Sequence, residues 1–193
     1  MNTLMIFTDS SHYRGVGSWS VLFKSEENLI ISGICPQYVI TAAQGEAYAV
    51  FKAVELAKTL FPQNKRIRIH TDCIGLCSVL QKSSIPQKNP INRMIQQAIL
   101  KRLIQNQYEW TIAFVRSHQD LDDLSSVCNN LVDLHARRIR RKNQNNQPNN
   151  GYFSRVLEWF HQMGFSHPFY FKLLEKTFCS KVTPEFHSSV QLS

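Results

Sequence analysis

Four carboxylates in this sequence lie at positions where burial of a charge would be energetically unfavourable. Asp9 follows an apolar run, and none of the six residues before it is basic. Asp72 follows an alternating apolar segment, Glu46 follows Gly45, and Asp133 lies inside the run LVDL. A buried carboxylate is strongly disfavoured unless a cation or a hydrogen-bond network compensates it. Four such groups without a balancing base form the oxygen donor set that hard divalent cations prefer, most naturally Mg²⁺.

Three of these carboxylates also have an ordinary explanation when taken alone. Glu46 can be an acid in the first turn of a helix, favoured by the helix dipole. Asp72 can cap the helix that follows it, and Asp133 can face solvent. The argument for a metal site rests on the set, because each member falls at a consistent place in one sheet topology.

The hydrophobic pattern predicts alternating strands and helices. A first strand begins at residue 4 and ends at Asp9, and Gly33 could mark a bulge in the third strand. Thr41 and Gln44 have the spacing of a capping box at the start of the first helix. The further strands are predicted over residues 18–23, 28–35, 65–71 and 109–116, and the helices over residues 41–60, 74–80, 91–107 and 125–141.

This order predicts an α/β fold with a mixed five-stranded sheet, in which three strands are antiparallel and two are reached by parallel crossovers. Ligands collect at the carboxyl ends of strands in such sheets. Asp9 and Asp72 can therefore be neighbours if the first and fourth strands are adjacent. Glu46 is predicted in the first helical turn, where Gly45 would allow a close backbone approach.

Length and charge set further limits. The 193 residues are enough for one core and a small appendage. The net charge is +8, and most of the basic excess lies from Arg137 onward, which indicates either a polyanion-binding tail or a solvated, disordered one. Five cysteines without a CxxC pair indicate reduced thiols and an intracellular, cytoplasmic or nuclear protein. No apolar run approaches the roughly 20 residues of a membrane span.

Several motifs, in this order, resemble those of ribonuclease H (RNase H), and more closely the RNase H domain of retroviruses and related retroelements. They are IFTDSS with GVGSWSV, then TAAQGEAYAV, IRIHTDC, FVRSHQD and NNLVDLHAR. The resemblance covers about residues 3–141. It implies an RNase H-like domain over residues 1–141, with a polar linker over 142–150 and an aromatic-rich, helical C-terminal extension over 151–193.

The resemblance also implies a mechanism. Asp9, Glu46, Asp72 and Asp133 would bind two Mg²⁺ ions about 4 Å apart, with Mn²⁺ as a possible substitute, for hydrolysis of a phosphodiester bond. The loop histidine His118 would assist water activation or product release. The substrate would be the RNA strand of an RNA–DNA hybrid, selected through its 2′-hydroxyl groups across the minor groove.

Two groups of residues are the predicted substrate contacts. The first lies around the carboxylates and comprises Ser10, Ser11, Thr41 and Gln44. The second is the basic end of the last helix, with Arg137 and Arg138. The sequence departs from the family at Ala42 and Ala43, where many cellular members carry asparagines, and at Ser117, where a glycine usually precedes the loop histidine.

Three functions remain open from the sequence. The first is the active, metal-dependent endoribonuclease. The second is a catalytically weak or inactive module of retroelement origin that binds nucleic acid or protein, with a possible protein partner on the C-terminal extension; stacking of bases on the extension's aromatic residues is a further alternative. The third is an enzyme with the same fold that cuts DNA. Because the sequence begins with Met and contains no polymerase, we expect it to act without a fused reverse transcriptase.

Overall fold

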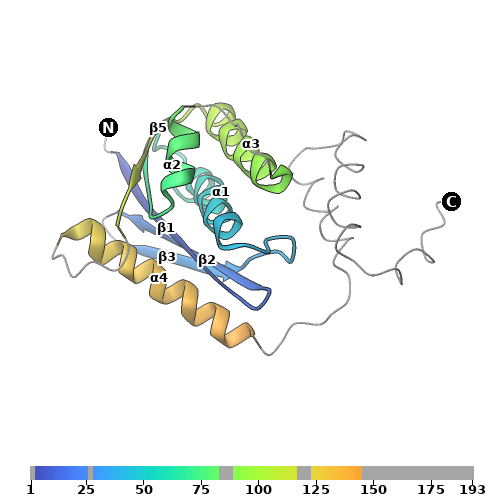
Figure 1. Ribbon diagram of the computed structural model, residues 1–193. Coiled ribbons are helices and arrows are strands. Elements are labelled where there is room, and N and C mark those ends of the chain that lie inside the picture. The colour runs from blue at the N-terminus through green and yellow to red at the C-terminus, as the bar shows by residue number, and fades with distance from the viewer. Residues whose placement is uncertain (1–2, 26–27, 83–88, 117–122, 145–193) are drawn as a thin grey trace.

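The computed structural model describes residues 3–25, 28–82, 89–116 and 123–144, and these residues form a five-stranded sheet with helices on both faces (Figure 1). The strands are β1 (Leu4–Tyr13), β2 (Val16–Lys24), β3 (Leu29–Ile34), β4 (Arg66–Thr71) and β5 (Glu109–Phe114). The helices are α1 (Ala42–Leu60), α2 (Ile74–Gln81), α3 (Pro90–Gln105) and α4 (Leu124–Asn143). Within this part of the chain, no helix is long and apolar enough to cross a membrane.

The strand order is β3-β2-β1-β4-β5. β1 pairs antiparallel with β2, β2 pairs antiparallel with β3, and β4 runs parallel to both β1 and β5. The mixed sheet with three antiparallel strands and two parallel ones is confirmed. The adjacency of the first and fourth strands, on which the predicted site depends, is confirmed with it.

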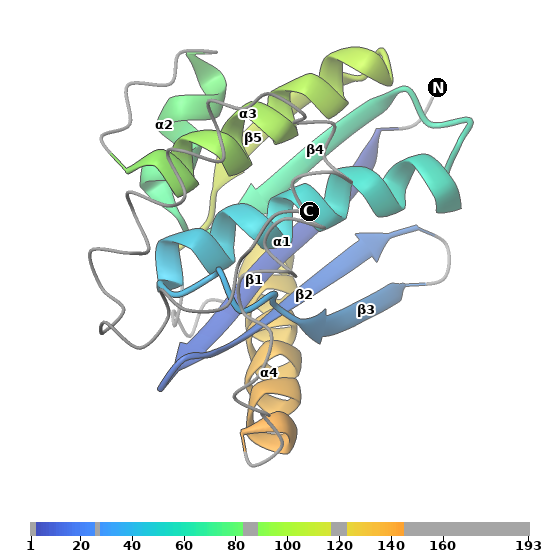
Figure 2. The same cartoon turned by 90° about the vertical axis from the view of Figure 1, so that its right-hand side faces the viewer.

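Side chains alternate between the two faces of β1, and each face packs against a different helix layer. Ile6 belongs to the large core beneath α1 and α3, while its neighbour Phe7 belongs to a smaller cluster beneath α4. Val132 of α4 is fully buried in that smaller cluster. Figure 2 shows α4 crossing behind the sheet, on the face opposite α1. Asp133 is thereby placed on the same side of the sheet as alternate residues of β1.

β1 is longer than predicted. The sequence indicated an end at Asp9, but the strand continues to Tyr13. β2 pairs with it along this whole length, with Asp9 opposite Ser20 and Tyr13 opposite Val16. The polar side chains after Asp9 look like a turn, but backbone pairing with β2 does not depend on apolar side chains. The parallel pairing with β4, in contrast, stops at Phe7.

The bulge considered at Gly33 is absent from β3, because the pairing with β2 runs through Gly33 without interruption. A Cβ atom at this position would lie 2.8 Å from the ring of Trp19 on the neighbouring strand. The glycine therefore makes room for an aromatic ring. The last helix also differs, since α4 continues to Asn143, beyond the predicted start of the linker at residue 142. The predicted C-terminal extension lies outside the described residues.

The start of α1 follows the predicted capping box. The hydroxyl of Thr41 accepts a hydrogen bond from the backbone N–H of Gln44, and the side-chain oxygen of Gln44 accepts from the backbone N–H of Thr41. Gly45 then brings α1 against β1, because a Cβ atom on Gly45 would lie 2.6 Å from Oγ of Ser10. Glu46 follows in the second helical turn, so the expectation of a first-turn acid was wrong.

The contact at Gly45 predicts a specific loss of stability. Gly45→Ala should force β1 and α1 apart and lower the free energy of unfolding by about 1–3 kcal/mol, the usual cost of overpacking. Gly75→Ala in α2 is the matched control, because a Cβ there meets nothing within 4 Å; alanine should leave stability unchanged or raise it by up to about 1 kcal/mol. Urea unfolding measures both. Equal stability of the two variants would contradict this account of the contact.

Candidate metal centre

Three of the four predicted carboxylates meet at one edge of the sheet. Asp9, Glu46 and Asp72 each offer an oxygen, and these oxygens all lie within 4.8 Å of one another. The last parallel pair of β1 and β4 joins Phe7 to His70, and Asp9 and Asp72 each follow two residues later. Because both aspartates lie two residues beyond the same paired position of parallel strands, their side chains come close together. β4 ends at Thr71, so the edge of β1 beyond it is open to Glu46.

Ser10 holds Glu46 in this group. Oε1 of Glu46 accepts hydrogen bonds from the Ser10 hydroxyl at 2.6 Å and from its backbone N–H at 3.1 Å. The other oxygen, Oε2, is buried and has no hydrogen-bond partner in the described part of the chain. An unpartnered carboxylate oxygen in a residue grouped with two further carboxylates fits a cation, because it has the donor chemistry that hard divalent ions require. The three residues together could therefore hold a metal ion.

Burial and mutual repulsion both raise the pKa values of carboxylates in this group. The side chain of Asp9 is only 5% exposed, and this burial, together with the charges of Asp72 and Asp133, raises its pKa to about 7. Burial and the charges of Asp9 and Asp72 also raise the pKa of Glu46 well above its ordinary value. In the absence of a cation, protons therefore compete for these oxygens near neutral pH.

His70 precedes Asp72 by two residues but carries no positive charge at neutral pH. Its ring stacks on Phe7 with the ring centroids 4.5 Å apart. Burial, reinforced by the charge of Arg68, lowers the pKa of His70 to about 4, so the ring is neutral at pH 7. His70 therefore adds no charge at pH 7 that would offset the carboxylates.

Asp133 lies apart from the other three carboxylates and has a basic partner. Nε of Arg137, four residues along α4, lies 2.7 Å from its carboxylate. The sequence interpretation of four carboxylates without a balancing base was wrong for this member. Oppositely charged residues at this helical spacing commonly pair, so the sequence did contain the signal. Asp133 nevertheless lies close enough for its charge to raise the pKa of Asp9.

The predicted substrate contacts occupy different positions around this group. Thr41 is exposed at the N-cap of α1, whereas the side chain of Gln44 is fully buried and its oxygen is used in the cap. The hydroxyl of Ser11 accepts a hydrogen bond from Nε of Arg140 at 2.9 Å. Arg138 is exposed on α4. His118 lies outside the described residues.

The four described cysteines, at positions 35, 73, 77 and 128, are free thiols, in line with the expectation of reduced cysteines. Cys179 lies outside the described residues. Cys73 occupies the N-cap position of α2, so Asp72 lies one residue ahead of that position.

No protein-family model matches the sequence, and no curated protein sequence is similar to it. Solved structures of similar shape do exist. RNase H1 from the halophilic archaeon Halobacterium salinarum NRC-1 superposes with a TM-score of 0.58 at 15% identity, over 73% of this chain and 99% of that one. LC11-RNase H1, isolated from compost by a metagenomic approach, gives a TM-score of 0.60 at 15% identity, over 74% of this chain and 98% of that one.

LC11-RNase H1 has also been solved in complex with an RNA/DNA hybrid, and that structure gives a TM-score of 0.60 at 13% identity over 72% of this chain and 98% of that one. The similarity extends over nearly the whole of each of these proteins. The chain therefore has the RNase H fold.

The raised pKa of Asp9 predicts how stability changes with pH in a metal-free sample. A carboxyl whose pKa is raised by folding contributes stability below its ordinary pKa of 3.8, and that contribution is lost as the pH rises through about 7. Asp9→Asn cannot ionise, so it should be more stable than the parent protein at pH 8, by on the order of 1–3 kcal/mol. The difference should shrink toward pH 5.

Unfolding free energies measured in a chelating buffer from pH 5 to pH 8 test this prediction. His12 and His70 titrate in both proteins and cancel in the difference. Glu109→Gln, at an exposed carboxylate paired with Arg66, is the control and should show no such trend. A difference between Asp9→Asn and the parent that does not change with pH would contradict the account.

Proposed function

We propose that this protein is an endoribonuclease that hydrolyses the RNA strand of RNA–DNA hybrids with two bound Mg²⁺ ions. The observation that carries the proposal is the group of three carboxylates, Asp9 of β1, Glu46 of α1 and Asp72 directly after β4, whose oxygens all lie within 4.8 Å of one another. The RNase H fold supports it, as does the hybrid bound in one structure of similar shape. A retroelement origin and an intracellular location remain part of the proposal.

Asp9, Glu46 and Asp72 would hold the ions, and Asp133 would join them once Arg137 turns away. The chemistry that such ions supply when bound is activation of the attacking water and stabilisation of the leaving 3′ oxygen. Ser10 fixes the direction of the Glu46 carboxylate before any ion arrives, through its two hydrogen bonds. Its backbone N–H also donates to Oδ1 of Asp9 at 2.6 Å. Ligands arranged in advance avoid the cost of ordering them during the reaction.

The proposed substrate contacts follow from the hydrogen-bonding groups and the exposure of each side chain. Because the Ser11 hydroxyl accepts a hydrogen bond from Arg140, its own proton is available for a 2′ oxygen of the RNA. The exposed Thr41 can serve in the same way. The buried side chain of Gln44 would act indirectly, by fixing the turn that presents Thr41. Arg138, and Arg137 once released, would contact phosphates, and His118 would assist water activation or product release.

Cleavage of labelled duplexes tests the proposal. The protein should cut the RNA of an RNA–DNA hybrid in Mg²⁺ or Mn²⁺ and leave RNA–RNA and DNA–DNA duplexes intact. Asp72→Asn should lower kcat/KM by more than about 100-fold, because even indirect disturbance of metal ligands costs 10–100-fold. Glu109→Gln is the matched control, since it removes a carboxylate at the opposite ends of the parallel strands, and it should retain activity.

An intact hybrid in both metals, with folded protein, would contradict the proposal. Cutting of DNA duplexes would instead favour a DNA nuclease with this fold.

The ion pair between Arg137 and Asp133 favours a second candidate function, a module that binds nucleic acid without cutting it. An arginine that holds the fourth carboxylate leaves only three for metal ions. Whether Arg137 yields to a cation separates the two functions. In the enzyme Arg137 competes with the metal ions for the carboxylate of Asp133, whereas in the binding module Arg137 takes the place of a metal ion there.

Arg137→Gln makes this competition measurable. Loss of a positive charge beside the site should lower the Mn²⁺ concentration at half-maximal thermal stabilisation by about three- to ten-fold, since one charge near a protein surface is worth on the order of 1 kcal/mol. Lys142→Gln removes an exposed charge further along α4 and should have a smaller effect. If both variants bind Mn²⁺ like the parent protein, Arg137 does not compete with metal.

A further inference from the structure

Two arginine side chains meet over one exposed tyrosine at the end of β1. Tyr13 is 47% exposed, and the guanidinium carbons of Arg14 and Arg140 each lie 5.3 Å from the centre of its ring. Arg14 comes from the turn between β1 and β2, and Arg140 comes from α4. Nε of Arg140 also donates a hydrogen bond to Oγ of Ser11. We call Tyr13, Arg14 and Arg140 the Tyr13 cluster.

Arg14 occupies a backbone conformation that an arginine disfavours. Arg14 and Gly15 form the two-residue turn of the β1–β2 hairpin, and their φ angles are +49° and +79°. Such turns require positive φ at both positions, which glycine and asparagine adopt more easily than residues with longer side chains. Gly15 fits this requirement, whereas Arg14 meets it at a cost in stability. Strained residues of this kind concentrate at functional sites, so the side chain of Arg14 calls for a function.

The charges of the Tyr13 cluster are not balanced within the described part of the chain. The ion pairs found there involve Lys52, Arg66, Arg102 and Arg137, and neither arginine of the cluster takes part in one. Two guanidinium groups over one ring repel each other, and the ring compensates each only in part. Anions bound to these guanidinium groups would offset their charges. Arginine is well suited to phosphate in particular, because its planar donors match the phosphate oxygens.

The position of the cluster identifies the anion. Asp9, Ser11 and Tyr13 alternate along β1 and therefore share one face of the sheet. Tyr13 lies four residues beyond Asp9, which is about 14 Å along an extended strand. Successive nucleotides of one strand of double-stranded DNA are about 3.4 Å apart along the helix axis, so this distance corresponds to about four base pairs of such a duplex. A duplex bound at the carboxylates can therefore extend over the cluster.

We propose that the Tyr13 cluster is a second binding site for the same RNA–DNA hybrid, which grips its phosphodiester backbone about four base pairs from the bond to be cleaved. The inference rests on the proposed function, because it assigns the strand that reaches the cluster to that substrate. Arg14 and Arg140 bind backbone phosphates, and Tyr13 holds their guanidinium groups in position. The carboxylates perform the chemistry, and the cluster fixes how the duplex lies across them.

Binding of an 18-base-pair hybrid, measured by fluorescence anisotropy in EDTA over a range of salt concentrations, tests this site without cleavage. Each phosphate contact that is lost should reduce the slope of log Kd against log salt by about 0.9. Arg14→Gly and Arg140→Gln should each show this reduction and bind more weakly at low salt. Arg14→Gly also removes the strained conformation, so its melting temperature should not fall, and weaker binding by this variant cannot be attributed to unfolding.

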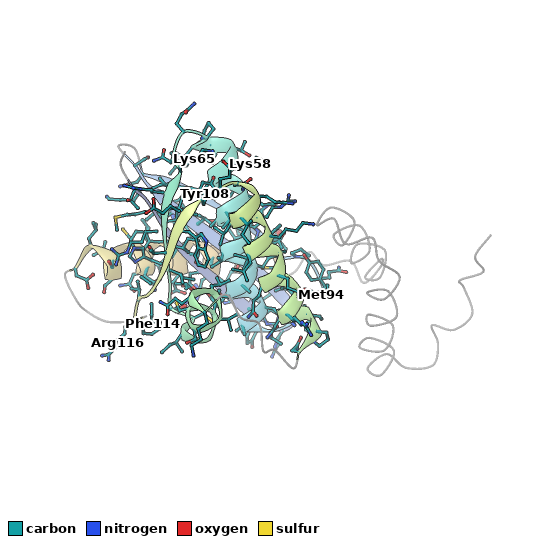
Figure 3. All side chains as sticks on the ribbon, turned by 90° about the horizontal axis from the view of Figure 1, so that it is seen from above. Lys58, Lys65, Met94, Tyr108, Phe114 and Arg116 are labelled. Carbon is teal, nitrogen blue, oxygen red and sulfur yellow. The ribbon has the colours of Figure 1, made fainter. Side chains whose placement is uncertain are left out.

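Lys58→Gln is the matched control. Lys58 lies with Lys65 at the end of the molecule opposite Phe114 and Arg116, where β5 reaches the edge that carries the carboxylates (Figure 3). The slope of log Kd against log salt for Lys58→Gln should equal that of the parent protein. Equal slopes for Arg14→Gly, Arg140→Gln and Lys58→Gln would overturn the inference, even if the protein cleaves hybrids. A reduced slope in a protein that cuts no hybrid would instead support the cluster and contradict the nuclease proposal.

Discussion

The repulsion among closely grouped carboxylates is the constraint on which the rest of this structure depends. Asp9, Glu46 and Asp72 lie close together, and burial raises the pKa of Asp9 and of Glu46. Folding alone would favour apolar residues or a basic partner at these positions. The surrounding structure instead maintains the arrangement. Parallel pairing of β1 with β4 brings the two aspartates together, and the close approach of α1 at Gly45 brings in the glutamate.

α4 adds a second electrostatic layer to this site. It is fixed to the sheet by apolar packing of Val132 and by the buried hydroxyl of Ser18, which donates a hydrogen bond to the carbonyl oxygen of Ala136 at 2.6 Å. The same helix carries Asp133 near the site and also carries Arg137, which forms an ion pair with Asp133. Its last turn brings Arg140 to Tyr13. One helix therefore places the negative charge of Asp133 near the carboxylate group and the positive charges of Arg137 and Arg140 further along, where a polyanion would approach.

The sequence predicted the parts of this arrangement that depend on hydrophobic period and strand order. The capping box at Thr41 and the positions of Asp9 and Asp72 relative to the parallel strands are of this kind. It did not predict the continuation of β1 to Tyr13, because pairing with β2 is a backbone property that polar side chains conceal. It did not predict the room that Gly33 makes for Trp19 either, since that contact joins two strands.

Diffraction from crystals soaked in Mn²⁺ tests the central claim most directly, because the anomalous signal of manganese locates the ion without reference to activity. The account predicts a peak among the carboxylate oxygens of Asp9, Glu46 and Asp72, with the previously unpartnered Oε2 of Glu46 within ligand distance. The peak should vanish in Asp9→Asn. A structure with these three side chains in place and manganese bound only elsewhere would contradict the claim that their grouping forms a metal centre.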